Sequence, residues 1–246
     1  MSGHSHWHSI KYQKTVADAK KSKAFSKMAR EITIITREGG GNPEFNSKLR
    51  LTIEKAREIN MPADNIEKAI KRGTGELAGE TLENVAFEAY GPGGIAIIIE
   101  GITDNKNRTL GEIKQILIQG GGKLVSEGSV KWMFEKKGCI TIQITNHYQS
   151  TDKEDLELRA VETGAEDFHW HNEFLDIYTK SEELEKVKKN LEGKGIKIES
   201  ISLDWVAKEE ISLNEEDKIT CQKLFESLDE NDSVQEIYSN VKAYKL

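Results

Sequence analysis

Three histidines near the amino terminus have a spacing that could bind a metal ion. They are His4, His6 and His8, and in an extended segment their alternation would direct all three imidazoles to one side. The segment offers no fourth ligand and no helix or strand pattern that would hold the rings in place. We therefore expect no metal site here.

A segment rich in acidic residues and histidine, 166–171, is the strongest candidate for catalysis. On a strand, Asp167, His169 and His171 would share one face, where they could hold a metal ion or act as a general base. No serine or cysteine nucleophile motif accompanies them. The glycine-rich turn 91–94 precedes a strand rather than a helix, which argues against a phosphate-binding loop. The sequence therefore predicts that the protein is not an enzyme and needs no cofactor.

Four cations on one predicted helix have a spacing that could bind the phosphates of a nucleic acid. Lys20, Lys23, Lys27 and Arg30 fall within one arc of a helical wheel, opposite the apolar residues of the same segment. Like charges on one face repel one another, and a polyanion would offset that repulsion. The sequence therefore predicts an exposed nucleic-acid-binding face. The cations that could extend this face are Lys11, Lys14, Lys68, Lys71 and Arg72.

The distribution of charge supports a local basic surface. The chain has a net charge of −7, but residues 1–74 contain 15 Lys and Arg against 8 Asp and Glu. The remaining residues contain 20 and 34, so a balance of +7 precedes a balance of −14. Such asymmetry indicates a basic binding module attached to an acidic body.

Apolar residues recur with helical spacing in three consecutive segments near the amino terminus. We expect Asn42 to cap the second helix and the third helix to be capped near Asp64. Amphipathic helices with short connections are typical of a small bundle. The three segments are 16–37, 42–60 and 64–73.

After a polar linker at 74–82 the pattern changes to short strands and helices. A hairpin is expected over 87–102, followed by a helix at 105–117 and a strand at 130–134. From residue 138 a β-α-β-β-α-β series is typical of a ferredoxin-like unit. Its elements are expected at 139–145, 153–162, 165–169, 174–179, 182–191 and 196–206.

A helix and a strand near the carboxyl terminus, 219–228 and 234–238, cannot bury a core alone, so we expect them to complete the first sheet. The predicted fold class is therefore α+β, with an N-terminal three-helix domain and two α+β domains, one ferredoxin-like and inserted in the other. The predicted domains are residues 1–78, residues 79–136 with 207–246, and the insertion 137–206.

The sequence also indicates where the protein resides. It has no run of about 18 apolar residues, so we expect no membrane span. Residues 1–14 lack the features of export or import signals. Cys139 and Cys221 have no CxxC partner, and we expect them to be reduced core residues of a cytoplasmic protein.

Specific motifs occur in several segments of the chain, at 3–7, 18–32, 60–75, 87–100, 103–109, 128–138 and 163–167. Together these segments resemble the YebC/PmpR family of bacterial regulators, whose mitochondrial relative is the translational activator of cytochrome oxidase. The resemblance covers most of the chain. It departs from the family at His6, where a Lys is usual, and at Lys21 and Ser22, where Arg-Gly is common.

The resemblance implies a helical domain and two α+β domains around a cleft, in a cytoplasmic regulator that binds DNA and controls transcription. Some relatives resemble ribosome-associated translation factors instead, and the family is not known for catalysis. Carried over residue by residue, the family's basic N-terminal residues add Lys21 to the predicted face. The complete predicted site is Lys11, Lys14, Lys20, Lys21, Lys23, Lys27, Arg30, Lys71 and Arg72.

The leading hypothesis is a DNA-binding transcriptional regulator of the YebC type. The alternative is a translation factor that binds ribosomal or messenger RNA, on or off the ribosome, through the same face. A third hypothesis is a protein-docking scaffold, whose binding would be insensitive to changes at the basic face. Reversing the charges of Lys20, Lys23 and Lys27 is expected to abolish nucleic-acid binding with thermal stability nearly unchanged.

Overall fold

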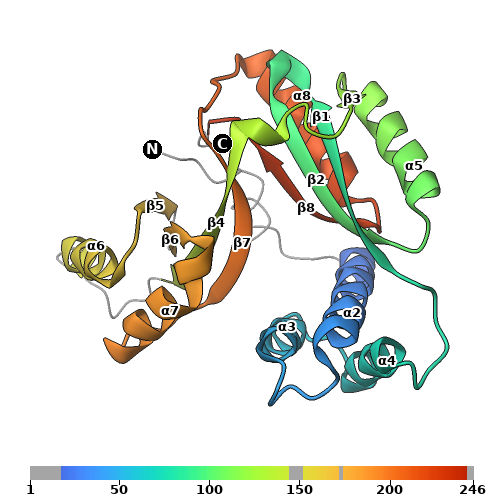
Figure 1. Ribbon diagram of the computed structural model, residues 1–246. Coiled ribbons are helices and arrows are strands. Elements are labelled where there is room, and N and C mark those ends of the chain that lie inside the picture. Colours follow the sequence, from blue (N-terminus) through green and yellow to red (C-terminus); the bar gives the residue numbers. More distant parts are fainter. Residues whose placement is uncertain (1–17, 144–151, 172–173, 243–246) are drawn as a thin grey trace.

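The computed structural model describes residues 18–143, 152–171 and 174–242, and the chain forms three parts (Figure 1). A helical domain comes first. A domain built on one four-stranded sheet follows, and a second four-stranded sheet with two helices forms the third domain. The predicted α+β class, with three helices before two α+β domains, is confirmed.

The helical domain buries the apolar face of each of its helices against the other two. Ile32, Leu49 and Ala56 are fully buried at its centre, and Met61 closes the core from the connection before the last helix. The apolar periodicity of the sequence therefore identified the correct inward faces. The helices are α2 (Asp18–Gly39), α3 (Ser47–Glu58) and α4 (Ala63–Thr74).

The predicted cap of the second helix is wrong, and the cap predicted near Asp64 lies two residues earlier. The N-cap of α3 is Asn46, whose side-chain oxygen accepts a hydrogen bond from a first-turn N–H at 3.1 Å. Asn42 instead closes the preceding turn by accepting from the Glu44 N–H at 2.9 Å. Pro62 occupies the cap position of α4 and Asp64 lies inside the first turn. The two asparagines give the same local signal, because asparagine favours turns as well as caps.

Helices α2 and α4 approach so closely that only a glycine fits between them. A Cβ built on Gly73 would lie 2.5 Å from the Cβ of Thr36 and 2.6 Å from the carbonyl oxygen of Thr33. We expect Gly73→Ala to lower the free energy of unfolding by about 2 kcal/mol through overpacking. Gly111→Ala is the control, because nothing lies within 4 Å of a Cβ there and alanine should stabilise that helix by up to about 1 kcal/mol. Urea denaturation of both variants is the measurement, and equal shifts would contradict the packing argument.

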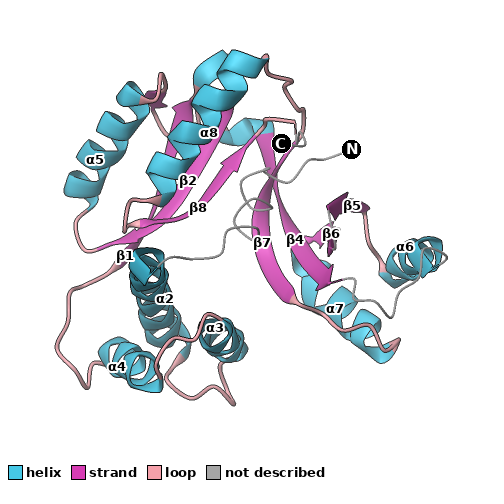
Figure 2. Ribbon diagram, turned by 180° about the vertical axis from the view of Figure 1, so that it is seen from behind, coloured by secondary structure: helices cyan, strands magenta, loops and turns pink. Residues whose placement is uncertain are grey.

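The first sheet has the strand order β3-β1-β2-β8, and α5 and α8 cover one of its faces (Figure 2). Ile97 and Ile99 of the central strand β2 point toward these helices, while Ala96 and Ile98 contact the third domain. Burial on both faces explains the continuous apolar run in β2. The elements are β1 (Glu83–Tyr90), β2 (Ala96–Thr103), α5 (Lys106–Gln119), β3 (Lys123–Val125), α8 (Glu215–Asp229) and β8 (Val234–Ser239).

The carboxyl-terminal helix and strand return to the first sheet, as the sequence predicted. Strand β8 pairs antiparallel with β2, with Ile237 opposite Ile99. Two details differ from the prediction. Strand β3 was missed because it has only three residues, and the predicted strand 130–134 is wrong because Lys131–Met133 form a 3-10 turn before the next strand.

The third domain has the strand order β5-β6-β4-β7 with antiparallel neighbours, which is the ferredoxin-like arrangement. Its strands β4 and β7 continue toward the first sheet, where Phe134 and Ala207 join a shared apolar cluster. The boundaries predicted at residues 136 and 206 therefore fall inside continuous strands. The elements are β4 (Phe134–Gln143), α6 (Asp152–Thr163), β5 (Asp167–His171), β6 (Phe174–Lys180), α7 (Leu184–Gly193) and β7 (Ser200–Ala207).

Both cysteines are buried thiols, Cys139 in β4 and Cys221 in α8. Burial, together with the nearby carboxylate of Asp217, raises the pKa of Cys221 to about 12. A thiol that stays protonated at neutral pH is a poor nucleophile and a poor metal ligand. Among the helices within the described ranges, none combines the length and apolar character needed to cross a bilayer.

Candidate nucleic-acid interface

Three members of the predicted cationic face of α2, Lys23, Lys27 and Arg30, contact the first-sheet domain. Lys27 is only 9% exposed, and its Nζ lies 2.9 Å from Oδ1 of Asp229 and 2.6 Å from the carbonyl oxygen of the same residue. One turn earlier, the Lys23 ammonium donates to the carbonyl oxygen of Glu230. We call these interactions the α2–α8 contact.

The chemistry of the α2–α8 contact follows from where α8 ends. Asp229 is the last residue of α8 and Glu230 is its C-cap. The last carbonyl groups of a helix have no partner within the helix and carry the negative end of its dipole. Lys23 and Lys27 donate to these carbonyls, and Lys27 also neutralises a carboxylate. The prediction of an exposed face is therefore wrong at Lys27.

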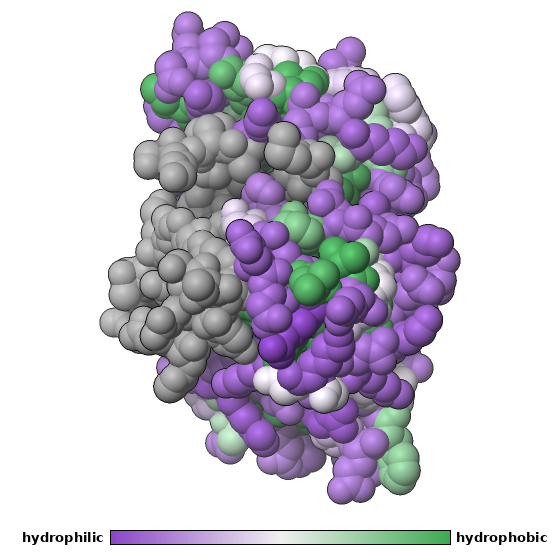
Figure 3. All heavy atoms as spheres, turned by 90° about the vertical axis from the view of Figure 1, so that its left-hand side faces the viewer, coloured by the Kyte–Doolittle hydropathy of each residue, from purple (hydrophilic) through white to green (hydrophobic). Residues whose placement is uncertain are grey.

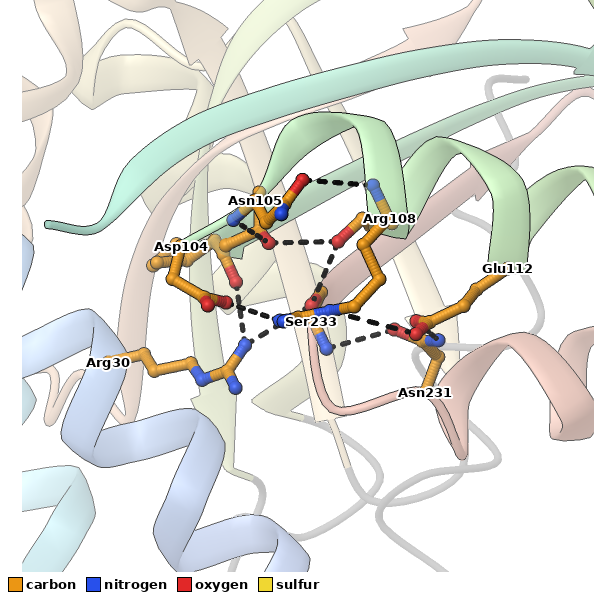
Figure 4. Close-up of polar contacts among 10 residues, drawn as sticks. Arg30, Asp104, Asn105, Arg108, Glu112, Asn231 and Ser233 are labelled. Carbon is orange, nitrogen blue, oxygen red and sulfur yellow. Dashed lines mark hydrogen bonds and ion pairs between the residues drawn. The ribbon is translucent and has the colours of Figure 1, made fainter. Parts of the chain in front are cut away.

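Arg30 extends the same connection into a polar network at the start of α5 (Figure 4). Its Nη1 donates to the carbonyl oxygen of Ile102 at 3.0 Å and to the hydroxyl of Ser233 at 3.2 Å. Ser233 in turn lies 3.3 Å from the Thr109 hydroxyl, which pairs with Thr103 at 2.8 Å. One arginine of the helical domain thus joins β2, α5 and the segment before β8.

The residues around this network are held by ion pairs and a helix cap. Asn105 caps α5 by accepting from the Arg108 N–H at 3.1 Å. The Arg108 guanidinium donates to Asp104 and holds the pKa of that carboxyl below its usual value. Asn231 donates to Glu112 at 2.8 Å and so ties the end of α8 to α5. These groups position one another and leave little freedom for acid–base chemistry.

The other predicted site residues have different positions. Lys21 is exposed on α2. Lys71 forms an ion pair with Glu67 at 2.6 Å, one turn earlier on α4. Arg72 is exposed. Lys11, Lys14 and the side chain of Lys20 lie outside the described residues. The contact of all these residues with nucleic acid stays a prediction.

A second group of cations on the helical domain was mostly missed by the sequence reasoning. Within the described part of the chain, none of its members forms an ion pair or a side-chain hydrogen bond. The sequence does contain a signal for them, because Lys48 and Lys55, like Arg50 and Arg57, are seven residues apart on α3. This spacing places each pair on one flank of the buried face of the helix. We call this group the unpaired cations. Its members are Arg37, Lys48, Arg50, Lys55, Arg57, Lys68 and Arg72.

The proposed metal or catalytic segment of the sequence corresponds to β5. Asp167 and His169 are half-buried on that strand, and the side chain of His171 lies outside the described residues. No group of three or more His, Cys, Asp or Glu side chains in the described ranges is placed to hold a metal ion.

One face of the molecule shows what kind of partner its surface favours. Figure 3 shows that the described atoms on this face are mainly hydrophilic, with apolar side chains in small separate groups. Large contiguous apolar patches are the usual mark of protein-docking surfaces. The visible part of this face therefore favours polar over apolar partners.

Comparisons with known proteins cover nearly the whole chain. The domain family "TACO1/YebC protein N-terminal domain" matches residues 5–76, and "TACO1/YebC second and third domain" matches residues 82–241. A "Probable transcriptional regulatory protein" of Persephonella marina is 48% identical over 98% of this chain and 95% of that protein. A protein of the same description from Caldanaerobacter subterraneus is 46% identical over 98% of each chain. The crystal structure of a conserved hypothetical protein from Aquifex aeolicus matches with a TM-score of 0.86 and 44% identity over 97% of each chain.

Proposed function

The chain belongs to the TACO1/YebC family, and from this premise we propose that it is a DNA-binding transcriptional regulator that contacts the phosphate backbone through its helical domain. The proposal includes a cytoplasmic location and no catalytic activity. The relatives described above are named probable transcriptional regulatory proteins, which supports a role in transcription. The proposed contact of the helical domain with the phosphate backbone rests on the unpaired cations.

The unpaired cations are the observation that carries the proposal. Seven positive side chains without an ion-pair partner are concentrated on one small domain, whereas the residues that follow it carry an excess of 14 negative charges. A polyanion would be attracted to the helical domain and repelled by the rest of the chain. Binding of this kind releases counterions, so its affinity should fall steeply with salt.

The third helix of the domain is poorly suited to read bases. In helix-turn-helix proteins the first residues of the recognition helix contact base edges in the major groove. The corresponding turn of α4 carries Asp64, followed by Glu67, and two carboxylates there would face the phosphates of both strands. The proposal therefore predicts contacts to phosphates rather than to base edges. Phosphate contacts specify neither the sugar nor the sequence of the nucleic acid.

The quantitative test replaces three unpaired cations of α3 with glutamate. They are Lys48, Arg50 and Arg57. Affinity for duplex DNA should fall at least about tenfold, and the slope of log affinity against log salt should shrink by about 3. All three side chains are exposed, so the thermal midpoint should change little. The matched control reverses Lys114, Lys189 and Lys197, which are exposed outside the helical domain. Equal losses in the two triple variants would overturn the assignment of the interface.

Crosslinking in cells, followed by sequencing of the bound nucleic acid, decides which polymer is the partner. Enrichment of discrete DNA sites supports the proposed regulator. Predominant recovery of ribosomal or messenger RNA would overturn the DNA assignment and favour the translation factor, which would use the same phosphate contacts.

A further inference from the structure

We propose that a pocket between α2, α4 and the linker after α4 binds a single nucleotide unit, with its phosphate between Arg30 and Arg72. The pocket has a volume of about 320 Å³. That volume lies at the lower end of the range for small-ligand sites. The pocket depends on the proposed function in one respect, namely that the nucleotide it binds is part of a nucleic-acid strand.

Arg30 enters the pocket already oriented. Its Nη1 is fixed by the Ile102 carbonyl and the Ser233 hydroxyl, at 3.0 and 3.2 Å. Figure 4 shows the other terminal nitrogen, Nη2, pointing away from these acceptors. In the described part of the chain neither Nη2 nor Nε of Arg30 has a hydrogen-bond partner. A guanidinium held on one side keeps its remaining donors for a phosphate and loses little entropy on binding.

Arg72 faces the pocket from α4. It is one of the unpaired cations, and its aliphatic stem lies against Gly79 of the linker. A Cβ built on Gly79 would lie 3.3 Å from both Cγ and Cδ of Arg72, so the linker follows the arginine closely. The exposed hydroxyl of Ser26 on α2 adds a neutral donor to the same wall. Two guanidinium groups and a hydroxyl make a donor set suited to phosphate oxygens.

The rest of the lining favours a nucleotide over a free phosphate ion. Glu80 of the linker lies in the same wall, and its carboxylate would repel a bare anion. A carboxylate accepts hydrogen bonds well from a sugar hydroxyl or a base amino group. Ala29, Ala78 and Leu82 supply apolar surface beside it. Cationic, acidic and apolar parts of one pocket therefore match the phosphate, the hydroxyl or amino groups, and the base of one nucleotide.

The test compares three variants by fluorescence anisotropy with a short single-stranded oligonucleotide and by calorimetry with a 5′-mononucleotide. Arg72→Gln should weaken both interactions about tenfold, because a charge-assisted contact is lost. Lys68→Gln is the matched control, since Lys68 is exposed and unpaired on the same helix but does not line the pocket. It should change the affinity for the mononucleotide by less than about threefold, because Lys68 lies outside the pocket lining. Glu80→Gln should strengthen the binding of inorganic phosphate, which the wild type binds more weakly than the mononucleotide.

The outcomes separate this pocket from the proposed function. If the wild type binds nucleic acid but Arg72→Gln behaves like Lys68→Gln, the pocket is overturned and the proposed function stands. If the mononucleotide binds in an Arg72-dependent way and no nucleic acid binds, the pocket stands and the proposed function is overturned. If neither ligand binds the wild type, both are overturned.

Discussion

Replacing Lys27 with glutamate should lower the free energy of unfolding by about 3 kcal/mol. The new carboxylate would face the Asp229 carboxylate and the carbonyl end of α8 across a contact in which Lys27 is 9% exposed. The two favourable contacts of Lys27, to the carboxylate and to the carbonyl oxygen of Asp229, would be replaced by repulsion at a site with little access to water. Chemical denaturation with two probes, one in the helical domain and one in the first sheet, measures the effect.

Two variants control this result. Lys48→Glu makes the same charge change at an exposed, unpaired side chain of the same domain and should alter the unfolding free energy by less than about 0.5 kcal/mol. Adding Asp229→Lys to Lys27→Glu should restore only part of the loss, because Lys27 also donates to a backbone carbonyl whose charge cannot be exchanged. Equal stability of Lys27→Glu and Lys48→Glu would show that the α2–α8 contact contributes nothing in solution.

The same contacts revise the expected effect of the triple reversal at Lys20, Lys23 and Lys27. The sequence predicted lost binding with nearly unchanged stability. Because Lys23 and Lys27 join the helical domain to α8, the structure predicts lost stability as well. Lost binding in that triple variant would therefore not identify an interface, whereas lost binding at exposed Lys48, Arg50 and Arg57 would.

Much of the fold could be predicted from the sequence because its signals are local. Helical and alternating periodicities identify which residues face inward along each segment. The β-α-β-β-α-β order then leaves few topologies for the third domain. The return of β8 to β2 followed from a simple physical argument, since one helix and one strand cannot bury a core.

The cationic face of α2 shows where local signals end. A helical wheel places Lys23, Lys27 and Arg30 opposite the apolar stripe, but it does not tell what lies on that side. Solvent, a nucleic acid and the polar end of another helix all suit a row of cations. The partner residues Asp229 and Ser233 lie about 200 positions later in the chain, so only the tertiary structure brings them together.

Glu88 carries the second large effect that the structure predicts. It is 6% exposed on β1, and its two carboxylate oxygens accept from the N–H groups of Gly128, Val130 and Lys131 at 2.6, 2.7 and 3.0 Å. These bonds fix the loop that leads from the first sheet into β4. Replacing Glu88 with alanine would leave three buried or half-buried donors without their acceptor, and should lower the free energy of unfolding by about 3 kcal/mol.

The same carboxylate makes the stability depend on pH. Burial alone would raise the pKa of Glu88, but the three backbone donors and the charge of Lys131 outweigh burial and lower the pKa below the usual 4.5. The unfolded chain therefore takes up this proton at a higher pH than the folded chain does. The contribution of Glu88 is fully present above about pH 4.5 and is lost as the pH falls through the lower folded pKa.

Glu88→Gln tests this dependence without a change of shape. The amide retains one acceptor but directs an NH₂ group at backbone donors, so the variant should be less stable than the wild type at neutral pH. It should also lose less stability than the wild type between about pH 6 and pH 3. An ordinary glutamate titrates between about pH 6 and pH 3, which sets this range. Glu83→Gln on the exposed end of the same strand is the control and should follow the wild-type curve. If Glu88→Gln also follows the wild-type curve, the three hydrogen bonds do not favour the ionised carboxylate. The charge of Glu88 would then contribute nothing to holding the loop before β4.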